Sequence, residues 1–259
     1  MDFGIEGKVA MVAAASKGIG LATAKALTEE GCVVSICGRT EATLEAAAAE
    51  IGGETRPYVV DVSSSEDLDW WYRQTLEDLG PVDILVTNTG GPAAGNVFEL
   101  TDEQWLEGVQ STLMNVVRLT RMVKNSMAER QWGRIVHITS YVAKEPSTVL
   151  PISTTLRSGL MGLTKVQAAE LGEFGITVNS VLPGSTLTDR ILHLADIRAE
   201  KMGITQEEAL QKQAQESAVK RIADPSEIGA TIAFLCSQQA AYITGTSILV
   251  DGGLAKGIG

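Results

Sequence analysis

Short apolar runs alternate with longer, amphipathic segments along most of the chain. The apolar runs are rich in β-branched residues and are expected to be strands, at residues 8–15, 32–37, 56–62, 82–88, 133–140, 176–182 and 246–251. Strands that are apolar throughout are typical of a sheet whose two faces are both covered. The repeated order of strand and helix therefore predicts an α/β fold, a doubly wound parallel sheet of about seven strands with helices on both faces.

Capping signals mark where several helices begin. Ser-x-x-Glu and Thr-x-x-Gln patterns at Ser63 and Thr101 have the spacing of capping boxes. Asp224 is an N-cap residue followed by Pro225, which suits the first helical position. No linker or internal repeat interrupts the alternation, so we expect residues 1–259 to form a single domain.

Composition and charge exclude several classes of function. The chain has 259 residues, 44% of them hydrophobic, and a formal net charge of −11, which disfavours nucleic acid or anionic lipid as a partner. Its three cysteines form no CxxC pair, so we expect a reduced, cytoplasmic protein without a metal site. The start "MDFGIEGK" lacks the basic residues of a signal peptide, and no apolar run reaches membrane-spanning length.

The first strand leads into a glycine-containing loop, "VAAASKGIGLATAKAL". Gly18 and Gly20 would let backbone amides at a helix N-terminus approach a pyrophosphate, where the helix dipole favours negative charge. In doubly wound sheets, ligands bind at the carboxyl ends of the strands, which is where this loop lies. The loop therefore indicates a dinucleotide site.

The glycine loop and several later stretches resemble the short-chain dehydrogenase/reductase family, in particular its 3-oxoacyl-(acyl-carrier-protein) reductases. The family's Thr-Gly-x-x-x-Gly-x-Gly loop corresponds to residues 13–20, with Ala14 in place of the first glycine. Residues 87–90, Thr-Asn-Thr-Gly, replace the family's Asn-Asn-Ala-Gly, and "ITGTSILVDGG" closes the chain as in the family. The resemblance spans nearly the whole chain and implies a Rossmann-type fold and hydride transfer with a nicotinamide cofactor.

The resemblance also implies where the cofactor binds. Asp61 and Val62 correspond to the residues beside the adenine, and Thr188 to a threonine that contacts the nicotinamide amide. The implied cofactor site comprises Ala14, Ser16, Lys17, Gly18, Ile19, Gly20, Arg39, Asp61, Val62, Asn88, Gly90, Arg157, Pro183, Gly184, Thr186 and Thr188.

Cofactor choice is decided at the end of the second strand. NAD-selective sites place a carboxylate there to bind the ribose 2′-OH, whereas a 2′-phosphate needs a cation. This chain has Gly38 followed by Arg39, and Lys17 in the glycine loop resembles a second basic residue of NADP-preferring relatives. Both cations could instead be ordinary surface residues, but the missing acid favours NADP(H).

The catalytic residues depart from the resembling family. The family's catalytic serine is followed by tyrosine thirteen residues later and lysine seventeen later, and an asparagine lies in the preceding long helix. Ser140 matches the serine, but Ser153, Arg157 and Thr112 occupy the other three positions. Serine is a far weaker acid than tyrosine, and arginine stays protonated, so the family's proton relay is missing.

Tyr141, next to Ser140, is one candidate for the missing acid. Neighbouring strand residues face opposite sides, however, which favours a phenol that points away from the pocket. Three hypotheses remain open. The first is an NADP(H)-dependent oxidoreductase that transfers a hydride between nicotinamide and a carbonyl/alcohol substrate, with a non-standard proton donor. The others are a non-redox enzyme such as a cyclase or lyase, and a cofactor-binding protein without turnover.

The remaining expectations concern the substrate and the assembly. A polar helical stretch at about residues 186–220 corresponds to the family's substrate lid, which orders on binding a small molecule. Relatives pair through two long helices, which correspond to residues 102–130 and 150–173, so we expect a homotetramer.

Overall fold

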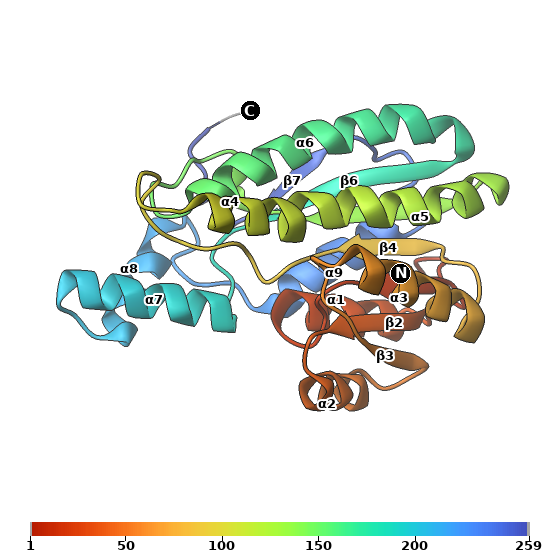
Figure 1. Cartoon of the computed structure of the whole chain (residues 1–259), viewed down its shortest axis with the longest axis horizontal. Coiled ribbons are helices and arrows are strands. Elements are labelled where there is room, and N and C mark those ends of the chain that lie inside the picture. Colours follow the sequence, from red (N-terminus) through yellow and green to blue (C-terminus); the bar gives the residue numbers. More distant parts are fainter. Residues whose placement is uncertain (1, 258–259) are drawn as a thin grey trace.

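The computed structural model describes residues 2–257 and contains one seven-stranded sheet in which every neighbouring pair of strands is parallel. The strand order is β3-β2-β1-β4-β5-β6-β7 (Figure 1). The strands are β1 Val9–Val12, β2 Val33–Gly38, β3 Thr55–Val59, β4 Ile84–Thr87, β5 Gly133–Ile138, β6 Ile176–Pro183 and β7 Ser247–Val250. All seven predicted strands are confirmed, and the order reverses between β1 and β4, where such sheets bind ligands.

Helices cover both faces of the sheet, as predicted. The α-helices are α1 Gly18–Glu29, α2 Glu41–Ile51, α3 Ser65–Asp78, α4 Asp102–Gly108, α5 Asn115–Glu129, α6 Pro151–Leu171, α7 Asp189–Met202, α8 Gln206–Glu216 and α9 Pro225–Cys236. A π-helix, η1 (Val109–Met114), joins α4 to α5, and the 3-10 helices are η2 (Tyr141–Ala143) and η3 (Gly172–Phe174). No helix within residues 2–257 is long and apolar enough to cross a membrane.

Each face of the sheet has its own buried core. On one face, α1, α2 and α9 pack against strand residues such as Val12, Ile36 and Val86. On the other face, α3, α5 and α6 pack against the alternate strand residues, such as Met11 and Leu85. This alternation explains why the strands are apolar throughout, because successive side chains enter different cores.

Helix capping follows the sequence with one correction. Thr101 forms a capping box, as expected, and Asp224 is the expected N-cap of α9, where it forms a capping box with Glu227. The cap of α3, however, is Ser64, whose Oγ accepts a hydrogen bond from the Asp67 amide, and not Ser63. Ser63 is engaged elsewhere, because its amide and its hydroxyl both donate to the Asp61 carboxylate, at 2.9 and 2.7 Å.

Two helices, α7 and α8, pack against each other at the end of the molecule where β6 finishes. Figure 1 shows them (cyan) beside the beginnings of α4 and α6, at one end of the molecule. A small core of Ala195, Ala199 and Ala209 joins the two helices. The segment expected to be a substrate lid is thus a helical pair at the carboxyl edge of the sheet.

Candidate active site

The glycine loop brings the end of β1 close to the start of α1. A Cβ on Gly20 would lie 2.4 Å from the backbone oxygen of Ala14, so only glycine fits there. Gly18 has a φ of 57°, and a Cβ on it would lie 3.0 Å from the Thr188 methyl group. The loop therefore lies against Thr188, the N-cap residue of α7, and it leads directly into the N-terminus of α1, the kind of position where phosphates bind.

Ala14, which replaces the family's first glycine, is in a left-handed conformation with a φ of 47°. Its carbonyl accepts a hydrogen bond from Asn88 Nδ2 at 3.2 Å. Asn88 follows β4, so this bond joins the glycine loop to the loop after β4. Alanine keeps the backbone path that glycine normally takes, at a conformational cost.

The end of β2 matches the pattern that favours a 2′-phosphate. Gly38 faces Ser16, and a Cβ on Gly38 would lie 3.1 Å from the Ser16 hydroxyl, so a longer acidic side chain has little room there. Arg39 is exposed and makes no hydrogen bond or ion pair with residues 2–257. Burial raises the pKa of Asp61, but hydrogen bonds from Ser63 and the charge of Arg39 outweigh it and leave the pKa below its usual value. Arg39 is thus an exposed cation near Asp61 that forms no ion pair within residues 2–257.

Lys17 makes a different contact from the one expected. Its Nζ lies 2.9 Å from the carboxylate of Asp189, the first residue of α7. Both side chains are exposed, so the pair contributes little to stability. The cation of the glycine loop therefore contacts α7 in this structure.

The other residues implied as cofactor contacts lie around the same edge of the sheet. Pro183 ends β6, and Gly184 fits tightly because a Cβ would lie 2.6 Å from the Asp251 Cα. Thr186 is buried, and Thr188 caps α7 through a bond from the Ile191 amide. Gly90 lies in open space after β4, Ile19 packs on the core beneath α1, and Val62 follows β3.

Arg157 and Ser153 form a buried pair at the start of α6. Both are only 6% exposed, and Arg157 Nε donates to Ser153 Oγ at 3.1 Å. Arg157 Nη1 donates to the carbonyls of Ile138 and Thr139, at 3.0 and 2.7 Å. These hydrogen bonds link the start of α6 to the end of β5, immediately before Ser140.

The electrostatics of Arg157 are unusual. Burial, followed by the positive charge of Arg190, lowers the pKa of Arg157 to about 10. Arg157 therefore remains charged at neutral pH, and no carboxylate within residues 2–257 forms an ion pair with it. A cation held only by neutral oxygens projects a positive potential into the space around it.

Ser140 and Ser153 have the same hydrogen-bonding arrangement. Ser140 Oγ accepts from the Val142 amide at 3.3 Å, and Ser153 Oγ accepts from Arg157. Because each oxygen accepts within the protein, each hydroxyl proton stays available to donate to a bound oxygen atom. The helix α6 packs against η2, which starts right after Ser140, so the two hydroxyls come from neighbouring elements.

Thr112 lies in the π-helix η1, and its hydroxyl is buried without a hydrogen-bond partner. The amide of Asn115 holds this turn: its Nδ2 donates to Ser111 O at 2.6 Å and to Asn88 O at 3.4 Å, while its Oδ1 is buried without a partner. Short π-helical turns occur frequently at functional sites. Thr112 was predicted as a site residue from the sequence, and Asn115 was not. Asn115 lies about one helical turn after Thr112, and this spacing could have identified it.

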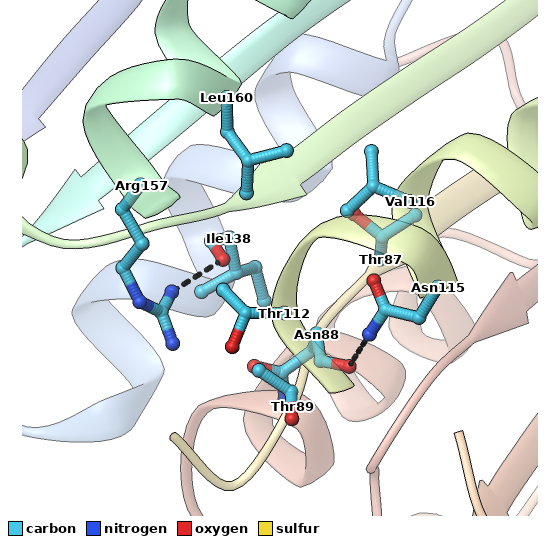
Figure 2. A pocket seen from close by; sticks show the side chains of 9 residues that line it. All are labelled: Thr87, Asn88, Thr89, Thr112, Asn115, Val116, Ile138, Arg157 and Leu160. Atoms are coloured by element: carbon cyan, nitrogen blue, oxygen red, sulfur yellow. Dashed lines mark hydrogen bonds between the residues drawn. The ribbon is translucent and has the colours of Figure 1, made fainter. Parts of the chain in front are cut away.

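Arg157, Thr112 and Asn115 line one narrow pocket, shown in Figure 2, whereas Ser140 and Ser153 are not among its lining residues. A terminal nitrogen of Arg157 and the Thr112 hydroxyl point into the space beside Asn88 and Thr89 (Figure 2). The lining residues are Thr87, Asn88, Thr89, Thr112, Asn115, Val116, Ile138, Arg157 and Leu160. The structure thus brings the residues at the family's asparagine and lysine positions together beside the loop that follows β4.

Tyr141 belongs to different surroundings. Burial raises the pKa of its phenol, and its charged neighbours are Glu216, Arg198 and Glu145, the first two of which lie on the lid helices. Arg157 is not among the charged groups that shift this pKa.

Arg190, one residue into α7, is a site residue that the sequence analysis missed. Its Nη2 donates to the carbonyl of Pro92 at 2.9 Å, and its side chain lies 3.5 Å from the Cβ position of Gly91. Burial lowers its pKa. Arg190 lies two residues after Thr188, and no local pattern of the sequence distinguishes it from a surface arginine of α7.

Comparison with known proteins places this geometry in a family. The profile described as enoyl-(acyl carrier protein) reductase matches residues 13–255. The 3-oxoacyl-(acyl-carrier-protein) reductase FabG of Haemophilus influenzae is 32% identical over 250 residues, 96% of this chain and 99% of that protein. The short-chain reductase protein NovJ of Streptomyces niveus is 33% identical over 248 residues, 95% of this chain and 93% of that protein.

Solved structures agree with the sequence comparison. L-sorbose reductase from Gluconobacter frateurii, complexed with NADPH and L-sorbose, has a TM-score of 0.94 and 33% identity over 100% of both chains. A variant of actinorhodin polyketide ketoreductase with NADPH has a TM-score of 0.93 and 34% identity, covering 96% of this chain and 98% of that one. The chain therefore belongs to the short-chain dehydrogenase/reductase family.

Proposed function

We propose that the protein is an NADP(H)-dependent oxidoreductase that interconverts a carbonyl compound and its alcohol, using serine hydroxyls where relatives of this type use tyrosine. The observation that carries this proposal is the buried bond from Arg157 to Ser153, which keeps a cation behind a hydroxyl that is free to donate. Structural relatives solved with NADPH support the choice of cofactor.

The residues of this chain fit such a cofactor. The close approach of Gly20 to Ala14 exposes the N-terminus of α1 for the pyrophosphate, and the unpaired Arg39 suits a 2′-phosphate. Asn88, Thr188 and Arg157 would surround the nicotinamide riboside. When bound, NADPH supplies the hydride that reduces the carbonyl carbon.

The two serines would stabilise the oxygen of the reacting carbonyl. Ser140 and Ser153 can each donate a hydrogen bond to this oxygen, and both bonds strengthen as negative charge develops on it. Arg157 lies behind Ser153 and adds an electrostatic contribution without giving up its proton, because its pKa of about 10 is well above neutral pH. Water that reaches the serines would then supply the proton to the alkoxide.

The proposal is tested by following NADPH oxidation with a panel of aldehydes and ketones. We expect turnover with some of them, and a loss of about 10- to 1,000-fold in Ser153→Ala and Ser140→Ala, the cost of removing one oxyanion donor. Thr155→Ala is the matched control, because Thr155 lies in the same helical stretch but is exposed.

Two other outcomes would replace the proposal. Product formation without net change of cofactor would indicate a non-redox enzyme such as a cyclase or lyase. Cofactor binding without turnover of any compound would indicate a binding protein.

We also propose that residues 1–259 act as one domain, with a substrate lid at about 186–220 formed mainly by α7 and α8. A homotetramer is supported by exposed apolar residues on the helices through which relatives pair, such as Leu106 on α4 and Val166 on α6, 64% and 54% exposed. Three unpaired, buried cysteines, Cys32, Cys37 and Cys236, suit a reducing, cytoplasmic location. Light scattering at micromolar concentration tests the assembly, and a monomer mass would contradict it.

A further inference from the structure

The π-helical turn η1 depends on one side chain for its hydrogen bonding. The backbone amide of Asn115 donates to the carbonyl of Gln110, five residues earlier, where an α-helix would use the carbonyl of Ser111. The Ser111 carbonyl therefore lacks its usual partner, and the Asn115 side chain replaces it, because Nδ2 donates to this carbonyl at 2.6 Å. Asn115 thus satisfies two successive carbonyls, one with its backbone and one with its side chain.

The packing on either side of η1 explains the extra residue in this turn. Before it, Gly108 ends α4 against α6, where a Cβ would lie 2.5 Å from Ile152 Cγ2. After it, Leu119 and Val123 of α5 are fully buried in the core. One residue corresponds to about 100° of rotation around an α-helix, so the turn lets α4 and α5 present different faces to their neighbours. Thr112, 1% exposed, lies within this turn, and its position depends on where the extra residue is accommodated.

Hydrogen bonds link η1 to the glycine loop. Asn115 Nδ2 also donates to the carbonyl of Asn88, at a longer 3.4 Å (Figure 2). Asn88 Nδ2 in turn donates to the carbonyl of Ala14 at 3.2 Å. Because Thr112, Asn88 and Arg157 line the same pocket, these bonds connect the glycine loop to the residues of that pocket.

A second link joins η1 to the loop after β3, which contains the implied adenine contacts. Arg118, in the first turn of α5, donates from Nη1 to the carbonyl of Ser63 at 3.2 Å and from Nη2 to Gln110 Oε1 at 2.8 Å. Ser63 in turn bonds to the Asp61 carboxylate. Gln110 therefore takes part in both arrangements, because its carbonyl belongs to the π-helical turn and its side chain bonds to Arg118.

We infer that Asn115 and Arg118 are positioning residues, which connect the two cofactor loops to η1 and thereby fix the Thr112 hydroxyl beside the nicotinamide end of the cofactor. The inference rests on the proposed function for its effect on turnover, though not for its effects on structure and cofactor affinity. Misplacing a group at a reaction centre by about 1 Å can cost about 100-fold in rate, so the register of this turn affects catalysis.

Variants of Asn115 separate its two side-chain bonds. Asn115→Ala removes both and should lower kcat for NADPH oxidation about 10- to 100-fold, while the Kd of NADPH from fluorescence titration changes by less than about threefold. Asn115→Ser should recover most of this loss, because a serine hydroxyl can donate to the carbonyl four residues earlier, as Thr164 does to Leu160 at 2.8 Å. The remaining deficit reports the longer bond to Asn88. Asn125→Ala is the matched control, because Asn125 is an exposed asparagine on the same helix.

Arg118 should give the opposite pattern. Arg118→Ala leaves the Ser63 carbonyl without this bond and should raise the Kd of NADPH about 3- to 10-fold, with a smaller effect on kcat. Arg118→Lys should retain part of the affinity, since an ammonium can donate to one of the two oxygens, and Arg121→Ala is the control, an exposed arginine on the same helix. Asn115 and Arg118 both bond to Gln110, so the loss of kcat/KM in the double alanine variant should be at least about threefold smaller than the product of the two single losses.

Crystal structures of the Asn115 variants give a measurement that needs no turnover. In Asn115→Ala the amide of residue 115 should bond to the Ser111 carbonyl, as in an α-helix, so that the extra residue moves along the helix and Thr112 is displaced. In Asn115→Ser the bond to the Gln110 carbonyl should remain. Asn115→Leu keeps the volume without a donor, and it takes the place of the alanine variant if that variant does not fold.

Three results would overturn the inference: an unchanged π-helical turn in Asn115→Ala, an unchanged kcat in this variant, or independent effects of Asn115→Ala and Arg118→Ala. Failure of the reductase proposal gives a different result. If no carbonyl compound oxidises NADPH, but the crystal structures and the NADPH titrations change as described, the positioning roles stand and the proposed reaction is wrong. If carbonyl compounds are reduced and Asn115→Ala retains kcat, the reaction stands and the positioning role is wrong.

Discussion

The cofactor side and the substrate side of this site have diverged from the family to different degrees. On the cofactor side, the glycine loop keeps its path even though Ala14 replaces a glycine, and Asn88 still bonds to the Ala14 carbonyl. On the substrate side, three of the four positions that the family resemblance implies are catalytic carry other residues, and Arg157 and Ser153 are bonded to each other.

The difference shows that the residues of the two sides are constrained by different kinds of contact. The glycine loop is limited by steric contact, since a Cβ on Gly20 would meet the Ala14 carbonyl at 2.4 Å, so few sequences fit. On the substrate side, the choice of residues is limited by hydrogen bonding. The Arg157 guanidinium donates to the Ile138 and Thr139 carbonyls and also to the Ser153 hydroxyl. A set of side chains that changes together can therefore preserve the fold while it alters the chemistry.

The largest expected effect comes from making the substrate side resemble its relatives. The double variant Ser153→Tyr and Arg157→Lys introduces a phenol and an ammonium one helical turn apart, on the same face of α6. We expect reduction of simple ketones to rise about 100- to 10,000-fold, the range for one general acid, while either change alone gives little because the pair acts as a unit. Steady-state NADPH oxidation measures this gain.

Thr112→Asn added to the double variant tests whether the third changed position also matters. No gain from the triple variant, with NADPH binding intact by fluorescence titration, would show that the substrate side no longer admits a simple ketone. The substrate side would then differ from the family in the shape of its pocket as well as in its side chains.

A buried histidine joins the two sides and should make the fold sensitive to acid. His137 lies 2.9 Å from both Thr87 Oγ1 and Gln167 Oε1, linking β4 through β5 to α6, and burial lowers its pKa to about 4. Between about pH 6.5 and pH 4 this histidine is protonated in the unfolded chain but neutral in the folded protein. The free energy of unfolding therefore decreases as the pH is lowered through this window. The loss should reach about 3 kcal/mol.

Urea unfolding at a series of pH values measures this effect, with His137→Asn as the comparison. The variant should lose about 3 kcal/mol less than the unaltered protein between pH 7 and pH 4. Parallel pH dependences for the two proteins would mean that His137 does not govern acid stability.

Much of the cofactor side could be predicted from the sequence, because its signals are local. The strands are marked by continuous apolar runs, and the Gly18 and Gly20 spacing directly follows the first of them. Arg39 could be placed directly after β2 because the end of that strand is marked by its own apolar run. These features depend on short-range patterns, and the fold predicted from them agrees with the structure.

The substrate side depends on contacts between distant segments. The π-helix around Thr112 is held by Asn115, which reaches Asn88, 27 residues away. Arg190 contacts Pro92 across 98 residues, and no local pattern distinguishes it from a surface arginine of α7. The cap of α3 was misplaced for a different, local reason: Ser63 bonds to the Asp61 carboxylate two residues earlier, and Ser64 caps the helix instead.

Cofactor preference is a smaller effect that sharpens the description of the cofactor side. Arg39→Asp should weaken NADPH binding about 10- to 100-fold, because a charge-assisted bond to the 2′-phosphate is replaced by repulsion, and should leave NADH binding unchanged or stronger. Lys17→Gln should have a weaker effect, since Lys17 already pairs with Asp189. Fluorescence titration with both nucleotides measures the preference, and equal affinities in the unaltered protein would show that Arg39 does not select NADPH.

The smallest effect is expected at Ala14, where the cofactor side itself departs from the family. A left-handed alanine costs about 1–2 kcal/mol, while glycine adds about 0.5–1 kcal/mol of unfolded-state entropy, so Ala14→Gly should stabilise by about 0.5 kcal/mol. Ala15→Gly is the control: Ala15 is buried and lacks a positive φ, so it should destabilise by at least about 0.5 kcal/mol. Opposite signs in urea unfolding would show that the loop path is fixed by its contacts with Gly20 and Asn88, and that alanine is accommodated there against its own preference. Equal destabilisation by both changes would mean that the Ala14 side chain contributes packing that outweighs its backbone strain.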